Sequence, residues 1–78
     1  MAIFTETTWA NMQAFTATVR GHEYAVVNYR DHWEVYVKNA STRAWNRGRW
    51  SHGKWFATIQ EVAQTYKNLA GLDMLVQA

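Results

Sequence analysis

The chain has no cysteine and no proline among its 78 residues. Without cysteine, no disulfide can stabilise the fold and no thiolate can bind a metal or attack a substrate. No apolar run approaches the roughly 18 to 20 residues of a membrane span, and residues 1–6 lack the basic and apolar segments of a signal peptide. We therefore expect a cytoplasmic protein with no membrane contact.

Acidic residues are missing from the middle of the chain, with none between Glu34 and Glu61. Residues 35–60 therefore have a net charge of +5, while the parts on either side are slightly acidic. The five cations are Lys38, Arg43, Arg47, Arg49 and Lys54. Such a one-sided charge steers anionic partners, but five cations alone do not define a nucleic-acid binder.

Aromatic residues are abundant: five tryptophans, four tyrosines and three phenylalanines. Each can bury roughly 150–250 Å² on folding, which suits a chain that depends on apolar burial alone. Intrinsically disordered chains are poor in aromatic residues. We therefore expect residues 1–78 to form a single folded domain.

Alternation of apolar and polar residues predicts a sheet within residues 13–56. The clearest strand has Trp33, Val35 and Val37 on one face and Glu34 and Tyr36 on the other. The predicted strands cover residues 13–20, 22–30, 33–38 and 43–50, the last with a bulge or tight turn near residue 48. Residues 1–11 show no clear period and are expected to be an irregular lead-in, with an edge strand or one helical turn as the alternatives.

A C-terminal helix is predicted over residues 58–70. Thr58 and Glu61 have the spacing of a capping box, and an apolar stripe follows at helical spacing. Gly71 suits the helix end, and residues 72–78 form a short apolar tail. The predicted fold is α+β: an antiparallel three- to four-stranded meander sheet with one amphipathic helix packed on one face.

No catalytic or metal-binding pattern stands out. The three histidines, His22, His32 and His52, fall in predicted turns, where we expect them to face water, and none has a zinc-ligand spacing. Ser51 precedes His52, but nothing suggests a third group to orient that histidine. The glycines form no phosphate-binding loop. We therefore expect no enzyme, no cofactor and no metal site.

The segment of residues 44–56 interleaves tryptophans with cations, which suits a surface that contacts nucleic acid or an acidic protein patch. It equally suits a sheet end whose tryptophans fill the core. Trp33 and Trp55 are expected to be buried, whereas Trp45 and Trp50 are left open. Exposed sheet edges also allow self-pairing into a homodimer. The candidate partner-binding residues are Arg43, Trp45, Arg47, Arg49, Trp50 and Lys54.

The C-terminal third, from Gly53-Lys54-Trp55-Phe56 through Thr58-Ile59-Gln60-Glu61-Val62 to Tyr66-Lys67 and Gly71-Leu72, resembles the end of small proteins encoded on phages and plasmids. In those proteins a strand ending in an aromatic residue leads into a helix of the form ΦxSIxEVxxxYK. The small size, the lack of cysteine and the sheet-plus-helix layout resemble the single-domain anti-CRISPR inhibitors of such elements. No functional residue carries over from that resemblance.

The resemblance implies a stoichiometric inhibitor that masks a site on a protein or ribonucleoprotein target. The alternative is a small nucleic-acid-binding accessory or regulator protein that uses residues 43–56. A DNA mimic is disfavoured, because mimicry requires a dense acidic face.

Overall fold

The structure, a computed structural model, describes residues 3–38, 50 and 53–77. It contains one antiparallel sheet whose strands follow the order of the chain. These are β1 (Thr5–Trp9), β2 (Met12–Val19), β3 (His22–Asn28), β4 (Trp33–Lys38) and β5 (Lys54–Phe56). The α+β class is confirmed, but the predicted count of three to four strands is wrong, since the described part of the chain already has five.

Two-residue turns with positive φ close the first two hairpins. Ala10 and Asn11 (φ 51° and 67°) join β1 to β2, and Arg20 and Gly21 (φ 53° and 82°) join β2 to β3. Two successive positive φ angles define a type I′ turn, whose twist matches that of the paired strands. Asn11 and Gly21 adopt this conformation readily, whereas Ala10 and Arg20 are held in it by the strands on either side.

The strand predictions were accurate in the middle of the sheet and left its start open. The predicted strand 33–38 is β4, and the predicted strands 13–20 and 22–30 match β2 and β3 to within two residues. The lead-in expected for residues 1–11 contains edge strand β1, which pairs with β2 from Thr5–Thr16 to Trp9–Met12. The predicted strand 43–50 lies outside the described residues apart from Trp50, which forms a β-bridge with Lys38.

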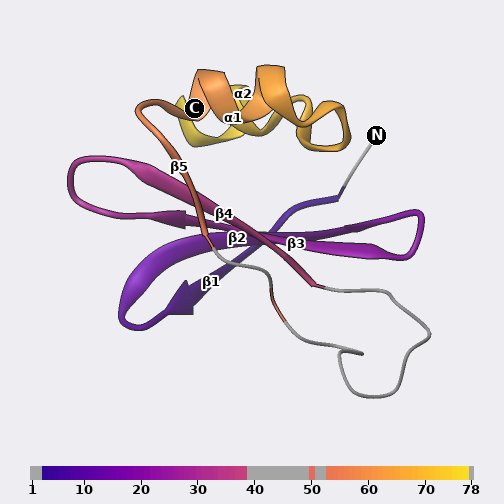
Figure 1. Ribbon diagram of the computed structural model, residues 1–78, viewed down its shortest axis with the longest axis horizontal. Coiled ribbons are helices and arrows are strands. Elements are labelled where there is room, and N and C mark those ends of the chain that lie inside the picture. The colour runs from indigo at the N-terminus through magenta and orange to yellow at the C-terminus, as the bar shows by residue number, and fades with distance from the viewer. Residues whose placement is uncertain (1–2, 39–49, 51–52, 78) are drawn as a thin grey trace.

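Helices cover one side of the sheet (Figure 1). They are α1 (Ile59–Thr65), the 3₁₀ turn η2 (Lys67–Leu69) and α2 (Leu72–Gln77). Thr58 caps α1 as the sequence predicts, because its Oγ1 accepts a hydrogen bond from the Glu61 N–H at 3.2 Å. The single helix predicted over residues 58–70 is wrong in its length, since α1 ends at Thr65.

Tyr66 interrupts the predicted helix. Its backbone is extended (φ −105°, ψ 101°), and its ring packs edge-on against Tyr24 at 6.0 Å and Phe56 at 5.8 Å between centroids. These two contacts outweigh helix propensity at this position. The chain resumes after Gly71 (φ 95°) as α2, where the sequence predicted only an apolar tail.

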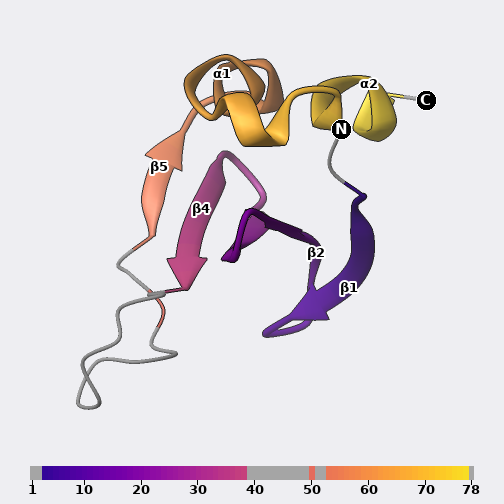
Figure 2. The ribbon, with the colours of Figure 1, turned by 90° about the vertical axis from the view of Figure 1, so that its right-hand side faces the viewer.

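The main core lies between the helices and the sheet, which Figure 2 shows as two layers. Val26, Val35, Val62, Leu69 and Leu72 are almost completely buried there. Burying an aliphatic side chain of this size stabilises the fold by about 1.5–3 kcal/mol. Trp33 also lies in this core, as predicted.

Candidate functional site

The side of the sheet opposite the helices carries its own apolar layer. Successive residues of a strand point to opposite sides, so neighbours of the core residues Val26 and Val35 face away from the helices. We call this side the helix-free face. Ala14, Ala25 and Val27 lie on it and are completely buried, although none of the helices that the structure describes covers them. Something else therefore shields these small side chains from water.

Aromatic side chains form that shield. Trp9 of β1 stacks on Tyr36 of β4, with 5.1 Å between ring centroids and 22° between ring planes. Trp50 and Trp9 form a T-shaped contact, with 5.4 Å between ring centroids. Because β2 and β3 separate β1 from β4 by about 14 Å at normal strand spacing, the two rings must lean toward each other over the small residues beneath them. The helix-free face thus has a second, smaller core.

Trp50 is fixed at the rim of this second core. It bridges to Lys38, whose Nζ lies 5.4 Å from the centroid of the indole and 3.8 Å from Glu23 Oε2. A cation over an indole contributes roughly 0.5–1 kcal/mol at an exposed site. Trp50, which the sequence left open between core and contact surface, is half-buried.

Of the six predicted partner-binding residues, the structure describes only Trp50 and Lys54, and it places them apart. Arg43, Trp45, Arg47 and Arg49 lie outside the described residues. Lys54 pairs with Val35 on the helix side of β5, exposed and with its Nζ 5.7 Å from the centroid of the Phe56 ring. Trp50 and Lys54 therefore lie on opposite faces of the sheet.

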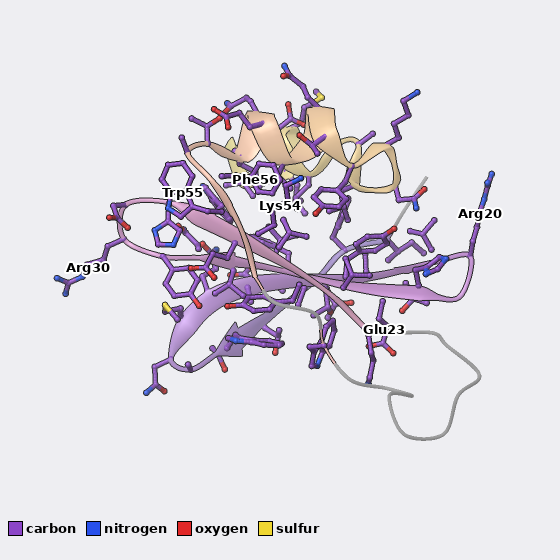
Figure 3. The ribbon with its side chains drawn as sticks, in the orientation of Figure 1. Arg20, Glu23, Arg30, Lys54, Trp55 and Phe56 are labelled. Atoms are coloured by element: carbon purple, nitrogen blue, oxygen red, sulfur yellow. The ribbon has the colours of Figure 1, made fainter. Side chains whose placement is uncertain are left out.

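Trp55 is 59 % exposed, so the prediction that it is buried was wrong. The reason is the alternation within β5: Phe56 fills the helix-side core, which directs the preceding side chain to the other face. Figure 3 shows Phe56 beneath the helices and Trp55 beside the turn between β3 and β4. A large aromatic surface is thus left in contact with water.

The indole of Trp55 rests on a stack of two further rings. Tyr29 and His32 are almost parallel, with 4.7 Å between centroids and 4° between planes, and His32 and Trp55 stack at 5.6 Å and 21°. We call Tyr29, His32 and Trp55 the ring stack. Such offset arrangements contribute about 0.5–1.5 kcal/mol beyond area burial for each pair. The outer face of Trp55 is the exposed end of the ring stack.

Two carboxylates hold the central ring. His32 Nε2 lies 2.7 Å from Glu34 Oε2, and Nδ1 contacts Asp31 Oδ1. Carboxylates only accept hydrogen bonds, so both nitrogens must donate and the ring is a cation. The hydrogen bonds to Glu34 and Asp31 raise the pKa of His32, and His32 lowers the pKa of both carboxyls. The expectation that His32 faces water was wrong, since its side chain is only 15 % exposed.

A hydrogen-bond chain joins the ring stack to the second core. The Tyr36 hydroxyl donates to Glu34 Oε1 at 2.9 Å, and the Tyr29 hydroxyl donates to Tyr36 at 3.0 Å. The bond to Tyr29, burial and the bond to Glu34 all raise the pKa of Tyr36. Tyr36 therefore stays neutral, stacks on Trp9 and orients the carboxylate that holds His32.

The hydrogen bonds of His32 leave it no free ring nitrogen. Both nitrogens of His32 are engaged, so neither is free to take a proton or bind a metal. Within residues 3–38, 50 and 53–77, no three His, Cys, Asp or Glu side chains form a group that could hold a metal ion. The site instead presents one exposed indole on a fixed base.

Sequence reasoning missed Trp9, Tyr29, His32 and Tyr36 as parts of the site. The alternation in β4 does place Glu34 and Tyr36 together on the side away from Val35. Nothing in the sequence indicates that Trp9 crosses the sheet to reach Tyr36, because that contact depends on the pairing of four strands.

No protein-family model, curated protein or solved structure matches the chain. Function is therefore inferred from the ring stack and the face around it. No helix within the described residues is long and apolar enough to cross a membrane.

Proposed function

We propose that this chain is a non-enzymatic binding protein that recognises a protein partner through the exposed end of the ring stack. The observation that carries the proposal is that Trp55 remains 59 % exposed while its ring is stacked on His32. Tryptophan is among the residues most enriched at the energetic centres of protein interfaces.

The ring stack suits binding because its geometry exists before any partner arrives. His32 is fixed by Asp31 and Glu34, and Glu34 is fixed in turn by Tyr36. Binding to a side chain that is already ordered avoids the entropy cost of ordering it, about 0.5–1.5 kcal/mol for a flexible residue. Trp55 can therefore enter an apolar or aromatic pocket of the partner without that entropy cost.

The charges beside Trp55 favour a protein over a nucleic acid. The charges that meet at the ring stack are Asp31, Glu34 and His32, which sum to −1, so this end of the molecule does not attract a phosphate. Lys54 lies on the opposite face of β5. Arg30 precedes Asp31 in the chain, and Figure 3 shows it pointing outward from the turn, away from Trp55.

The form of this function that we propose is stoichiometric inhibition of the anti-CRISPR kind, in the cytoplasm of a host cell, by masking a site on a nucleoprotein complex. The resemblance of the C-terminal third, the small size and the α+β layout support it. Residues Arg43, Arg47 and Arg49 remain predicted contacts in this scheme.

The alternative, a nucleic-acid-binding regulator, is supported by the five cations of residues 35–60, a segment that contains no acidic residue. In that case the tryptophans stack on bases and the arginines contact phosphates.

The decisive variant is Trp55→Ala, with Met74→Ala as its control. Met74 is also a large, exposed apolar side chain, but it lies in α2 on the other side of the sheet. Purified, guide-loaded CRISPR effector complexes of different types are assayed for cleavage of labelled target DNA. We expect the wild type and Met74→Ala to inhibit one of them, and Trp55→Ala to lose about 2 kcal/mol of binding, roughly thirtyfold in Kd.

The contradicting outcomes are distinct. If no complex is inhibited, the anti-CRISPR form of the proposal fails. Equal inhibition by Trp55→Ala and the wild type would mean that Trp55 does not contribute to binding. The wild type and Trp55→Ala are also compared for binding to a labelled single-stranded oligonucleotide at physiological salt. Sub-micromolar binding by the wild type that is lost in Trp55→Ala would mean that the partner is a nucleic acid and not a protein. The double replacement Arg47→Glu and Arg49→Glu should abolish function and preserve the fold under either hypothesis.

A further inference from the structure

The two edges of the sheet differ in how they are protected. Edge strands of natural proteins are usually very short, or carry lysine, proline or a bulge, which prevents pairing with other chains. β5 has three residues and begins with Lys54. β1 has five residues and contains no lysine, arginine or proline. Its one charged side chain, Glu6, points toward the neighbouring strand β2, where Oε2 accepts a hydrogen bond from Gln13 Nε2 at 2.9 Å.

The turn geometry shows which backbone groups of β1 are unused. In a two-residue type I′ hairpin, the residues that flank the turn exchange both of their backbone hydrogen bonds. Trp9 and Met12 are that pair here, so Thr7 and Thr5 also direct their N–H and C=O groups toward β2. The Thr16 hydroxyl lies 3.5 Å from the Thr5 carbonyl, which agrees with this orientation. The N–H and C=O groups of Glu6 and Thr8 therefore point outward.

Within the described residues, β1 pairs with β2 alone, and Figure 2 shows it at the outer margin of the sheet. We propose that β1 pairs in antiparallel fashion with β1 of a second copy of this chain, around a two-fold axis at Thr7. A symmetric pair uses the same edge of both copies, so it removes the unprotected edge completely. The joined sheet then ends on two copies of β5, the protected edge.

Charge selects the register. Only Glu6 and Thr8 offer outward backbone groups, so the two strands can be centred on Glu6, Thr7 or Thr8. Centring on Glu6 sets two carboxylates directly opposite each other, which is unfavourable. Centring on Thr8 pairs Glu6 with Ala10, which already belongs to the turn. Centring on Thr7 pairs each Glu6 with the Thr8 of the other copy and uses all the outward groups.

The two-fold axis in this arrangement is perpendicular to the sheet. Both helix layers therefore lie on one side of a continuous ten-stranded sheet, and both helix-free faces lie on the other. The pairing uses none of the residues of the ring stack, so it holds or fails independently of the partner that Trp55 binds.

The absence of cysteine allows a direct test by single-cysteine variants of the full chain. In the proposed register the two Thr7 residues form a non-hydrogen-bonded pair, with Cα atoms about 4.5 Å apart, which lies within the range for a disulfide. The two Thr8 residues are offset along the strands, and their Cα atoms exceed the roughly 7 Å limit. Thr18→Cys, exposed on the interior strand β2, controls for random oxidation.

We expect Thr7→Cys to become a disulfide-linked dimer under mild oxidation in dilute solution, while Thr8→Cys and Thr18→Cys stay monomeric on a non-reducing gel. Cross-linking of Thr7→Cys no faster than that of Thr18→Cys would overturn the proposal. Cross-linking of Thr8→Cys instead of Thr7→Cys would overturn it as well, because the register would then be different.

A second measurement uses no cysteine. Thr8→Pro removes an outward N–H without touching the bonds to β2, whereas Thr8→Val keeps that N–H in a side chain of similar shape. In sedimentation equilibrium, the wild type and Thr8→Val should have twice the mass of the chain, and Thr8→Pro the mass of one chain. A monomeric wild type at the highest concentration tested would contradict the proposal.

Discussion

The imidazole of His32 donates a hydrogen bond from Nε2 to Glu34 Oε2 over 2.7 Å. Glu34 raises the pKa of His32 above its ordinary value of 6.5, and His32 lowers the pKa of Glu34 below its ordinary value of 4.5. The stabilisation by His32 is complete below pH 6.5 and is lost as the pH rises through the raised pKa. The stabilisation by Glu34 is complete above pH 4.5 and is lost as the pH falls through the lowered pKa. The hydrogen-bonded pair should therefore stabilise the fold most between pH 4.5 and pH 6.5.

Thermal unfolding of the wild type and His32→Gln across pH tests this expectation. The difference in Tm should be largest within that window and should shrink at alkaline and at strongly acidic pH. His22→Gln, at the exposed start of β3, controls for the loss of a histidine. A difference that does not change with pH would mean that the His32 ring is uncharged.

Gly53→Ala should destabilise the fold through a purely steric effect. A Cβ atom at this position would lie 2.7 Å from Tyr36 Cζ and would also meet the Glu34 carboxylate. Neither can move freely, because Tyr36 stacks on Trp9 and Glu34 holds His32. We expect a loss of about 1–3 kcal/mol in chemical denaturation, as for other overpacked sites.

Tyr36→Leu provides the control for that prediction. It removes the ring atoms nearest to Gly53, so Gly53→Ala should be less destabilising in this background. An equal loss of stability in both backgrounds would mean that the added Cβ does not clash with the Tyr36 ring.

Thr58→Ala should lower the free energy of unfolding by about 1 kcal/mol, the usual cost of losing an N-cap. The Thr58 hydroxyl accepts from the Glu61 N–H, which then lacks a helical partner. Thr65→Ala, at the exposed end of the same helix, removes a threonine that makes no cap and should have a smaller effect. Urea denaturation of the two variants compares them directly; equal losses would mean that the cap contributes nothing.

Val62→Asp should largely unfold the protein, because Val62 is completely buried and a charge there would have no partner. Gln64→Asp places the same side chain on the exposed side of α1 and should remain folded. Near-UV and far-UV circular dichroism distinguish these outcomes. A native-like Val62→Asp variant would mean that α1 does not pack on the sheet through Val62.

Local sequence patterns predicted the elements whose apolar residues recur regularly along one face or whose end carries a capping motif. The alternation of Trp33, Val35 and Val37 defines β4, and the spacing of Thr58 and Glu61 defines the start of α1. The sequence left β1 open between an irregular segment, an edge strand and a helical turn, because Thr5, Thr7 and Thr8 give no apolar alternation and the strand conformation depends on pairing with β2.

The remaining differences arise from contacts between distant parts of the chain. α1 ends early because the Tyr66 ring packs against Tyr24 and Phe56. Trp55 faces water because Phe56 occupies the core. The basic segment indicated a contact surface, but the ring stack requires Tyr29 and His32, which lie in the turn between β3 and β4.

The contact between Trp9 and Trp50 has a consequence for the order of folding. Each hairpin of the meander can form from neighbouring segments within microseconds, whereas these two rings come from opposite halves of the chain. We expect them to meet only after β1 to β4 have assembled, and Ala14, Ala25 and Val27 to stay hydrated until then. In stopped-flow refolding, the tryptophan fluorescence change should therefore lag behind the circular dichroism of the sheet, and Trp9→Phe should reduce the amplitude of that late phase.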